Sequence, residues 1–311
     1  MPLAQAKPTG PSSAATMLSI SLMIMAVALF SLLDAMGKHL GASLPILQVA
    51  WVRFATHLLF CFAFLQLWRH PGRLKTDRPW LQITRGLLLL GTTVFNFFAL
   101  QHLQLAETAS IMFSAPIVVA ALAVPLLGEH VGVRRWAAIA VGFIGVLIVT
   151  RPGLDGLGWP ALIAVASMTC FAFYSLTTRL LATGQDAASL VFYSAAVPAI
   201  VIMPIGIFVW VWPTDGLTWL ILLSTGLVGG VGHWLLVKAH QRADASTLSP
   251  FIYTQIVWMI GLGWLWFGDI PTSWTLIGAA IIIGSGLYIL YRETIVGRRP
   301  PASNASKEIS S

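Results

Sequence analysis

The chain has 311 residues, of which 57% are hydrophobic and only 9% are charged, and its formal net charge is +7. An ordinary soluble domain carries roughly 25% charged residues, so this composition excludes a soluble protein and makes lipid the solvent for most of the chain. The basic residues lie in short segments between apolar runs. This arrangement excludes a folded basic domain that binds nucleic acid.

Ten apolar runs follow one another along the chain. Runs of about 20 residues cross the hydrocarbon core as helices, because a single helix satisfies its own backbone in lipid. Polar tails, 1–16 and 294–311, flank them. The expected spans are 17–37, 45–67, 82–101, 106–127, 132–150, 158–178, 189–211, 217–238, 247–267 and 273–291. We therefore expect an all-α membrane protein with ten transmembrane helices.

Two stretches about 140 positions apart resemble each other: 106–129 (AETASIMFSAPIVVAALAVPLLGE) and 243–269 (ADASTLSPFIYTQIVWMIGLGWLWFGD). Both begin with a small residue and an acid, and both end in glycine and an acid. Each contains a proline, Pro116 or Pro250, which removes a backbone hydrogen bond within the apolar run. Repeated hydrophobic halves with broken helices are typical of secondary transporters. We expect both prolines to act as hinges or to line the substrate path.

Lysine and arginine are unevenly divided between the two expected sides of the membrane. If the N-terminus lies inside, 15 of the 18 basic residues fall on the inner side, Lys38 and Arg151 lie at outer ends and Arg53 lies within a helix. Basic residues favour the cytoplasm, so we expect both termini there. With five spans in each half, the second half enters from the opposite side. The sequence thus predicts two inverted repeats, 17–153 and 157–293.

Ionisable residues inside the expected spans are the first candidates for a substrate site, because charge is costly in lipid. Asp34 and Lys38 lie four positions apart on the first helix and can share a face, or Lys38 can reach the outer headgroups alone. Arg53 lies at about the depth of Asp34, which predicts a buried contact between them. That contact is either a structural ion pair or an anchor or gate for a polar substrate.

A second polar pair follows from aligning the two halves. At an offset of 137, Asn96 corresponds to His233, and both lie among small residues that permit close helix packing or leave room for a ligand. We expect both near the middle of the membrane, where aromatic neighbours such as Tyr253 can stack on a flat ring. The remaining candidates for substrate binding are Ser114, Tyr174, Tyr253 and Gln255.

Several chemistries are missing from the sequence. It has no GxxxxGK[ST] loop for ATP, no His and Cys residues at metal-ligand spacing, and no HExxH or Ser–His–acid arrangement. We therefore expect no metal and no cofactor, and a membrane enzyme or an ion channel is a less favoured alternative. Cys61 and Cys170 lie within spans, which argues against a disulfide framework. The candidates for proton coupling are Asp34, Glu107 and His233.

The ten-helix layout in two halves resembles the EamA family of the drug/metabolite transporter superfamily. The resemblance rests on the paired Gly–acid helix ends, on the run Trp136–Gly145 with its spaced glycines, and on the glycines between Gly278 and Gly286. It covers about residues 17–293. It implies a carrier that moves a small metabolite across the bacterial inner membrane.

Within this family, several stretches are most similar to the riboflavin importers of proteobacteria. They are Leu33-Asp34-Ala35 with Lys38, Arg53, LLGTTVFNFFALQHL, EHVGVRRWAAIAVGFIGVLIVTRP, Gly232-His233, and Pro250-Phe251 with Tyr253. The same segments are also similar to bacterial S-adenosylmethionine importers and to metabolite exporters. The resemblance implies riboflavin uptake first. The alternatives are S-adenosylmethionine import and export of amino acids or related metabolites.

Overall fold

The computed structural model describes residues 13–64, 66–127, 133–151, 156–182, 185–240, 242, 248 and 251–291. These residues form helices and no strands, as the composition predicts.

The first half of the chain holds α1 (Ser13–Leu40), α2 (Ile46–Phe64), the 3₁₀ helix η1 (Pro71–Leu74), α3 (Pro79–Leu100), α4 (Leu105–Met112), α5 (Ala115–Leu127) and α6 (Val133–Thr150). The second half holds α7 (Gly158–Ala182), α8 (Ala187–Phe208), α9 (Gly216–His240), α11 (Gln255–Leu262), the π-helical turn η2 (Gly263–Phe267) and α12 (Ser273–Tyr291). Most helices match their expected spans to within a few residues. The first helix instead begins at Ser13, inside the stretch expected to be a tail, because alanines with high helix propensity extend it.

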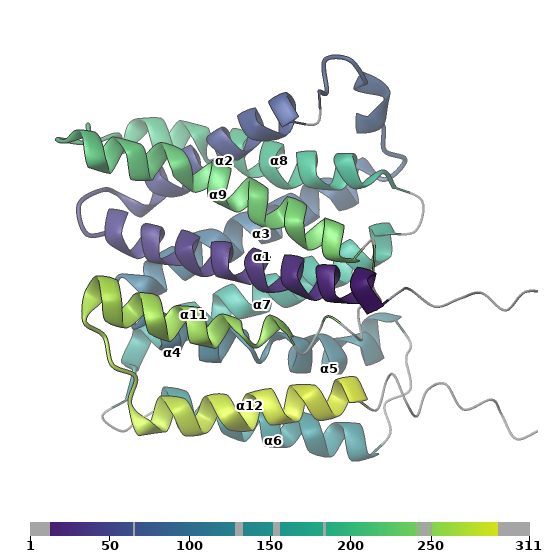
Figure 1. Cartoon of the computed structure of the whole chain (residues 1–311), viewed down its shortest axis with the longest axis vertical. Coiled ribbons are helices and arrows are strands. Elements are labelled where there is room, and N and C mark those ends of the chain that lie inside the picture. Colours follow the sequence, from purple (N-terminus) through teal and green to yellow (C-terminus); the bar gives the residue numbers. More distant parts are fainter. Residues whose placement is uncertain are drawn as a thin grey trace, which may run out of the picture.

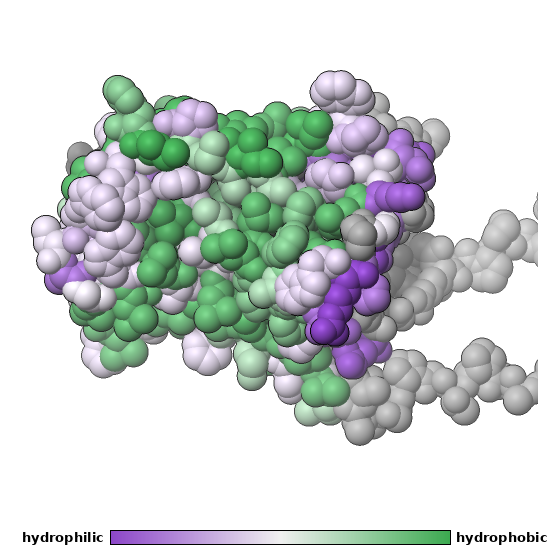
Figure 2. Space-filling view, turned by 90° about the horizontal axis from the view of Figure 1, so that it is seen from above, coloured by the Kyte–Doolittle hydropathy of each residue, from purple (hydrophilic) through white to green (hydrophobic). Residues whose placement is uncertain are grey.

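The helices suit a multi-pass membrane protein. Six of them are long and apolar enough to cross a membrane, within α1, α2, α3, α7, α8 and α9, and four shorter apolar helices accompany them among the described residues. Figure 2 shows a broad hydrophobic band on one face of the molecule, with hydrophilic residues gathered toward its ends. A surface of this kind matches a hydrocarbon layer bounded by polar headgroups.

Helices from the two halves of the chain pack against each other throughout the bundle (Figure 1). The closest partners are α1 with α9, α3 with α7, α2 with α8, and α6 with α12. The start of α1 and the end of α12 lie at the same end of the bundle (Figure 1). Contacts between the halves, rather than within each half, therefore hold the fold together.

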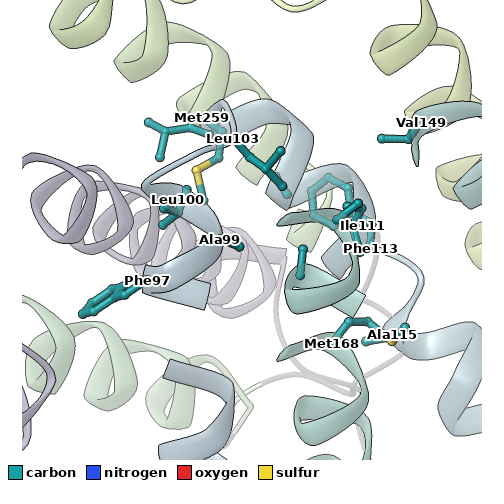
Figure 3. Close-up of a cluster of buried hydrophobic side chains, with 14 of the residues drawn as sticks. Phe97, Ala99, Leu100, Leu103, Ile111, Phe113, Ala115, Val149, Met168 and Met259 are labelled. Atoms are coloured by element: carbon teal, nitrogen blue, oxygen red, sulfur yellow. The ribbon is translucent and has the colours of Figure 1, made fainter. Parts of the chain in front are cut away.

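The span expected at 106–127 is two helices, α4 and α5, separated at Phe113 and Ser114. Pro116 lies in the first turn of α5, where its missing N–H needs no partner and its fixed φ suits a helix start. The predicted break in the backbone is confirmed here, whereas Pro250 lies outside the described residues. The break is surrounded by the main hydrophobic core (Figure 3), which includes Phe97, Ile111, Met168 and Met259.

Candidate functional site

Asp34 and Asn96 form the first contact of the candidate site. Nδ2 of Asn96, on α3, donates a hydrogen bond of 2.9 Å to Oδ1 of Asp34, on α1. Both side chains are half-buried. The two helices approach closely because Gly37, one turn after Asp34, lies against the ring of Phe97, and a Cβ at position 37 would collide with that ring. This packing holds Asn96 beside Asp34.

Arg53, on α2, is almost fully buried, with 5% of its surface exposed. Its guanidinium lies over the ring of Phe54, 4.2 Å from the ring centroid. Nε and Nη1 are buried and have no hydrogen-bond partner. Helix α9 covers this part of α2 closely, since a Cβ at Gly226 would lie 2.6 Å from the Arg53 carbonyl oxygen. Arg53 is thus a buried cation with free donors.

The predicted contacts of Asp34 with Arg53 and with Lys38 are both wrong. No ion pair joins them among the described residues, because Lys38 pairs with Asp269 and Asp34 accepts its hydrogen bond from Asn96. Asp34 and Arg53 interact electrostatically, without direct contact. The long side chain of Lys38 extends away from Asp34 and reaches Asp269 in the second half of the chain.

Two histidines extend this site toward α9. The imidazoles of His57 and His233 are stacked, with centroids 5.6 Å apart and planes 4° apart, and Phe30 meets His233 edge-on at 5.0 Å. His57 is buried, and neither of its ring nitrogens has a hydrogen-bond partner. His233 is half-buried and interacts electrostatically with Arg53. We call the following set the polar cluster: Asp34, Arg53, His57, Asn96 and His233.

His57 and Arg85 are the residues that sequence reasoning missed. The signal for His57 was its spacing, four residues after Arg53 on one helix face. Arg85 was counted among the basic residues of the inner side, yet it is 4% exposed within α3. It donates hydrogen bonds to Oγ1 of Thr178 (2.7 Å), the carbonyl of Leu190 (2.9 Å) and the hydroxyl of Tyr174 (2.9 Å). Arg85 therefore joins α3 to α7 and α8.

Tyr174, a predicted substrate residue, lies next to the polar cluster. The Tyr174 hydroxyl accepts a hydrogen bond from Arg85. The guanidinium of Arg85 also lies 4.8 Å from the centroid of the Tyr174 ring. Tyr174 interacts electrostatically with Arg53 as well. The structure thus brings Asp34, Arg53, Tyr174 and the predicted Asn96–His233 pair into one region.

The other predicted residues lie at the helix breaks instead. Ser114 is buried and donates through Oγ to the carbonyl of Ile111 (2.6 Å). Tyr253 packs edge-on against Phe113, with centroids 5.3 Å apart, and its buried hydroxyl has no partner. Gln255 is the half-buried first residue of α11. The expected stacking surface formed by Tyr253 beside Asn96 and His233 is therefore wrong, because Tyr253 belongs to the hydrophobic core.

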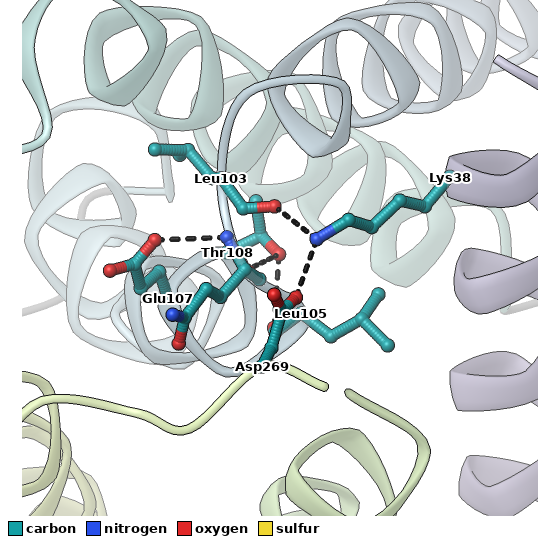
Figure 4. Close-up of polar contacts among 7 residues, drawn as sticks. Lys38, Leu103, Leu105, Glu107, Thr108 and Asp269 are labelled. Carbon is teal, nitrogen blue, oxygen red and sulfur yellow. Dashed lines mark hydrogen bonds and ion pairs between the residues drawn. The ribbon is translucent and has the colours of Figure 1, made fainter. Parts of the chain in front are cut away.

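Lys38 connects the two halves of the chain at one end of the bundle (Figure 4). Its Nζ lies 2.6 Å from Oδ2 of Asp269 and donates to the carbonyl of Leu103 at 3.0 Å. Gly268, whose φ of +70° favours glycine, ends η2 and turns the chain so that Asp269 faces α1. The Gly–acid pair in the second half of the chain thus supplies the partner of Lys38. Its counterpart at 128–129 lies outside the described residues.

Glu107, a predicted candidate for proton coupling, has a local role in the structure. Its Oε2 accepts a hydrogen bond of 2.9 Å from the backbone N–H of Gln104, just before α4 (Figure 4). A carboxylate at this position caps the start of a helix.

One hollow lies away from the polar cluster. It has a volume of about 630 Å³ and is lined mainly by apolar side chains of α5, α6 and α7. Several of these side chains, including Phe143 and Leu162, are exposed on the outer surface. An apolar groove on that surface suits lipid chains better than a polar metabolite. The volume of this hollow therefore does not make it the candidate substrate site.

Comparisons with known proteins show the family to which the chain is related. The model of the EamA-like transporter family matches residues 17–151 and again 158–291. Similar relatives include an S-adenosylmethionine uptake transporter of Rickettsia felis, 30% identical over 84% of this chain and 88% of that protein. They also include a riboflavin transporter of Rhizobium johnstonii, 28% identical over 89% of this chain and 92% of that protein.

A pseudopaline exporter of Pseudomonas aeruginosa is 26% identical over 85% of this chain and 93% of that protein. A solved crystal structure has the same fold, with a TM-score of 0.61 and 21% identity over 93% of this chain and 99% of that one. Since the family model accounts for nearly all of the sequence, the chain belongs to the EamA-like transporter family.

Proposed function

We propose that this membrane transporter is a secondary carrier, which binds a small metabolite at the polar cluster and exposes it alternately to the two sides of the membrane. The observation that carries the proposal is the polar cluster itself. Its side chains come from α1, α2, α3 and α9, inside a bundle whose outer surface is apolar. Ionisable groups inside a membrane bundle are costly, and they mark the path of substrates or ions.

The moving parts of the carrier are two inverted repeats of five transmembrane helices, 17–153 and 157–293. Two features support this division. At an offset of 140, the break after Met112 corresponds to the turn at Tyr253 and Thr254, and each break contains a hydroxyl that donates to the carbonyl three residues back. Moreover, the packing of α1 on α9 has its counterpart in the packing of α3 on α7.

Both termini face the cytoplasm in this proposal, and the membrane is the bacterial inner membrane. The uneven distribution of lysine and arginine supports this orientation. A C-terminal fusion to a reporter that folds only in the cytoplasm is expected to be active. Activity only of a reporter that requires export would contradict the ten-span arrangement.

Two substrates deserve direct comparison. Riboflavin uptake is supported by the sequence resemblance and by the Rhizobium relative, and S-adenosylmethionine uptake by the Rickettsia relative. The cheap test is growth rescue of a bacterial strain that cannot make riboflavin, at limiting external vitamin, beside rescue of a strain that cannot make S-adenosylmethionine. A carrier rescues at least one strain, and the Arg53→Gln variant at equal membrane level measures how far rescue depends on the polar cluster. No uptake of any metabolite by purified protein in liposomes would contradict the carrier itself.

A further inference from the structure

The charges of the polar cluster limit which metabolite it can bind. Arg53 is 5% exposed, and two of its three guanidinium nitrogens are buried without a partner. A buried cation is expensive unless an anion or several acceptors compensate it. Among the described residues, no carboxylate lies within ion-pair distance of Arg53. Arg53 can therefore pair with an anionic group of a ligand.

The guanidinium is arranged to receive such an anion. Its flat face is supported by the ring of Phe54 at 4.2 Å, which fixes its plane. Nη2 shares an edge of the group with Nε and another with Nη1, so either edge offers the two parallel donors that a carboxylate accepts. Helix α9 lies close to Nη2, since a Cβ at Gly229 would be 4.0 Å from it, in ordinary van der Waals contact.

Asp34 presents the opposite charge in the same region. One of its oxygens is held by Asn96 at 2.9 Å, and the half-buried side chain forms no ion pair among the described residues. Asp34 and Arg53 are near enough to interact electrostatically but do not touch. The polar cluster thus offers one anion and one cation that are held apart.

We propose that the substrate carries an amino-acid-type pair of charges, with its carboxylate on Arg53 and its ammonium group on Asp34. This inference rests on the carrier function proposed above and names the substrate class. S-Adenosylmethionine has this pair of charges, whereas riboflavin is neutral and would leave both residues without an oppositely charged partner. The stacked imidazoles of His57 and His233 lie beside the charged pair and provide an aromatic surface for the rest of the molecule.

The test uses the full-length protein in liposomes and labelled S-adenosylmethionine. Unlabelled S-adenosylmethionine, decarboxylated S-adenosylmethionine and riboflavin compete for uptake. The decarboxylated compound lacks only the carboxylate, so the comparison needs no variant. We expect it to compete at least about 100-fold more weakly, because a site built to bind a charged group rejects a ligand without it.

The variants then assign this discrimination to Arg53. Arg53→Gln is expected to compress the difference to within a few fold, while Arg53→Lys, which keeps the charge but not the fork of donors, keeps part of it. The matched control is Ser194→Ala, which corresponds to position 53 at an offset of 141 between the two halves and whose hydroxyl donates only to its own helix. This control should keep the full discrimination.

Any one of the following outcomes would overturn the inference: equal competition by both compounds in the wild-type protein, full discrimination in Arg53→Gln, or no uptake of S-adenosylmethionine. Uptake of riboflavin that is unaffected by Arg53→Gln would also overturn it, yet would keep the carrier function. The two proposals are therefore separated by the same experiment.

Discussion

Phe113 and Tyr253 meet edge to face, with ring centroids 5.3 Å apart and planes at 73°. They lie 140 positions apart, and each precedes a hydroxyl residue, Ser114 or Thr254, that donates at 2.6 Å to the carbonyl three residues back. The two helix breaks therefore touch through residues that are equivalent in the proposed repeat. Such a contact is where two halves related by a two-fold axis would meet.

The Tyr253 hydroxyl provides a test of whether this position is structural. It is buried without a partner, against the backbone of Gly286 on α12. Tyr253→Phe removes an unsatisfied polar group and is expected to raise the free energy of unfolding by about 1 kcal/mol while transport is retained. Gly286→Ala is expected to lower it, and to lower it less in the Tyr253→Phe background. Thermal unfolding in detergent measures all three variants, and loss of transport in Tyr253→Phe would instead place the hydroxyl on the substrate.

A variant of Asn96 tests whether its hydrogen bond to Asp34 serves transport or only the stability of the fold. Asn96→Ala removes a bond to a charged group, so we expect a loss of about 1.5 kcal/mol in stability and a fall in uptake of at least about tenfold. Gln101→Ala is the matched control, because Gln101, directly after α3, donates to the Gly41 carbonyl, directly after α1 (2.7 Å), outside the polar cluster. Equal uptake in the two variants would mean that Asn96 only holds helices together.

The contact between Lys38 and Asp269 is expected to stabilise the packing of the two halves at its end of the bundle. Its side chains are 16% and 23% exposed, whereas those of the Arg73–Asp186 pair are 42% and 39% exposed. A double-mutant cycle with Lys38→Met and Asp269→Asn should give a coupling energy of about 1–2 kcal/mol. The cycle for the exposed pair should give about 0.5 kcal/mol or less because solvent screens it. A coupling for Lys38 no larger than that of the exposed pair would contradict this assignment.

We expect the stability of the protein to depend on pH through Asp186, which lies outside the membrane-spanning segments. It accepts hydrogen bonds from Arg73 and caps the start of α8 at Ala188, and the Arg73 contact lowers the pKa of Asp186 below 3.8. Its contribution to stability is therefore present above about pH 3.8 and is lost as the pH falls through the lowered pKa. Asp186→Asn keeps a capping side chain, so it should melt slightly earlier than wild type at neutral pH. The difference should vanish in acid, and a difference that grew in acid would reverse the sign.

The sequence predicts the helices well and the contacts between side chains poorly. Apolar runs, prolines and Gly–acid ends locate the spans and the break before Pro116, because these features are local to each helix. The partners of Asp34 and Lys38 could not be derived from the sequence. The depth of a residue in the membrane does not determine how its helix is rotated about its own axis, and therefore which neighbour the side chain faces. The same uncertainty concealed Arg85, whose charge is compensated by acceptors on α7 and α8. The sequence does not predict such acceptors, because they come from helices that are far apart in the chain and meet only in the packed structure.

The most direct test of the account is solute counterflow with purified protein in liposomes. Liposomes are loaded with unlabelled S-adenosylmethionine or riboflavin, and entry of the same labelled compound is followed in wild type, Asp34→Asn, Arg53→Gln and Gln101→Ala, each at equal insertion. We expect wild type and Gln101→Ala to accumulate label transiently with at least one compound, while both variants of the polar cluster do not. Counterflow by Asp34→Asn and Arg53→Gln at the wild-type rate would contradict the central claim that the carrier binds its substrate at the polar cluster.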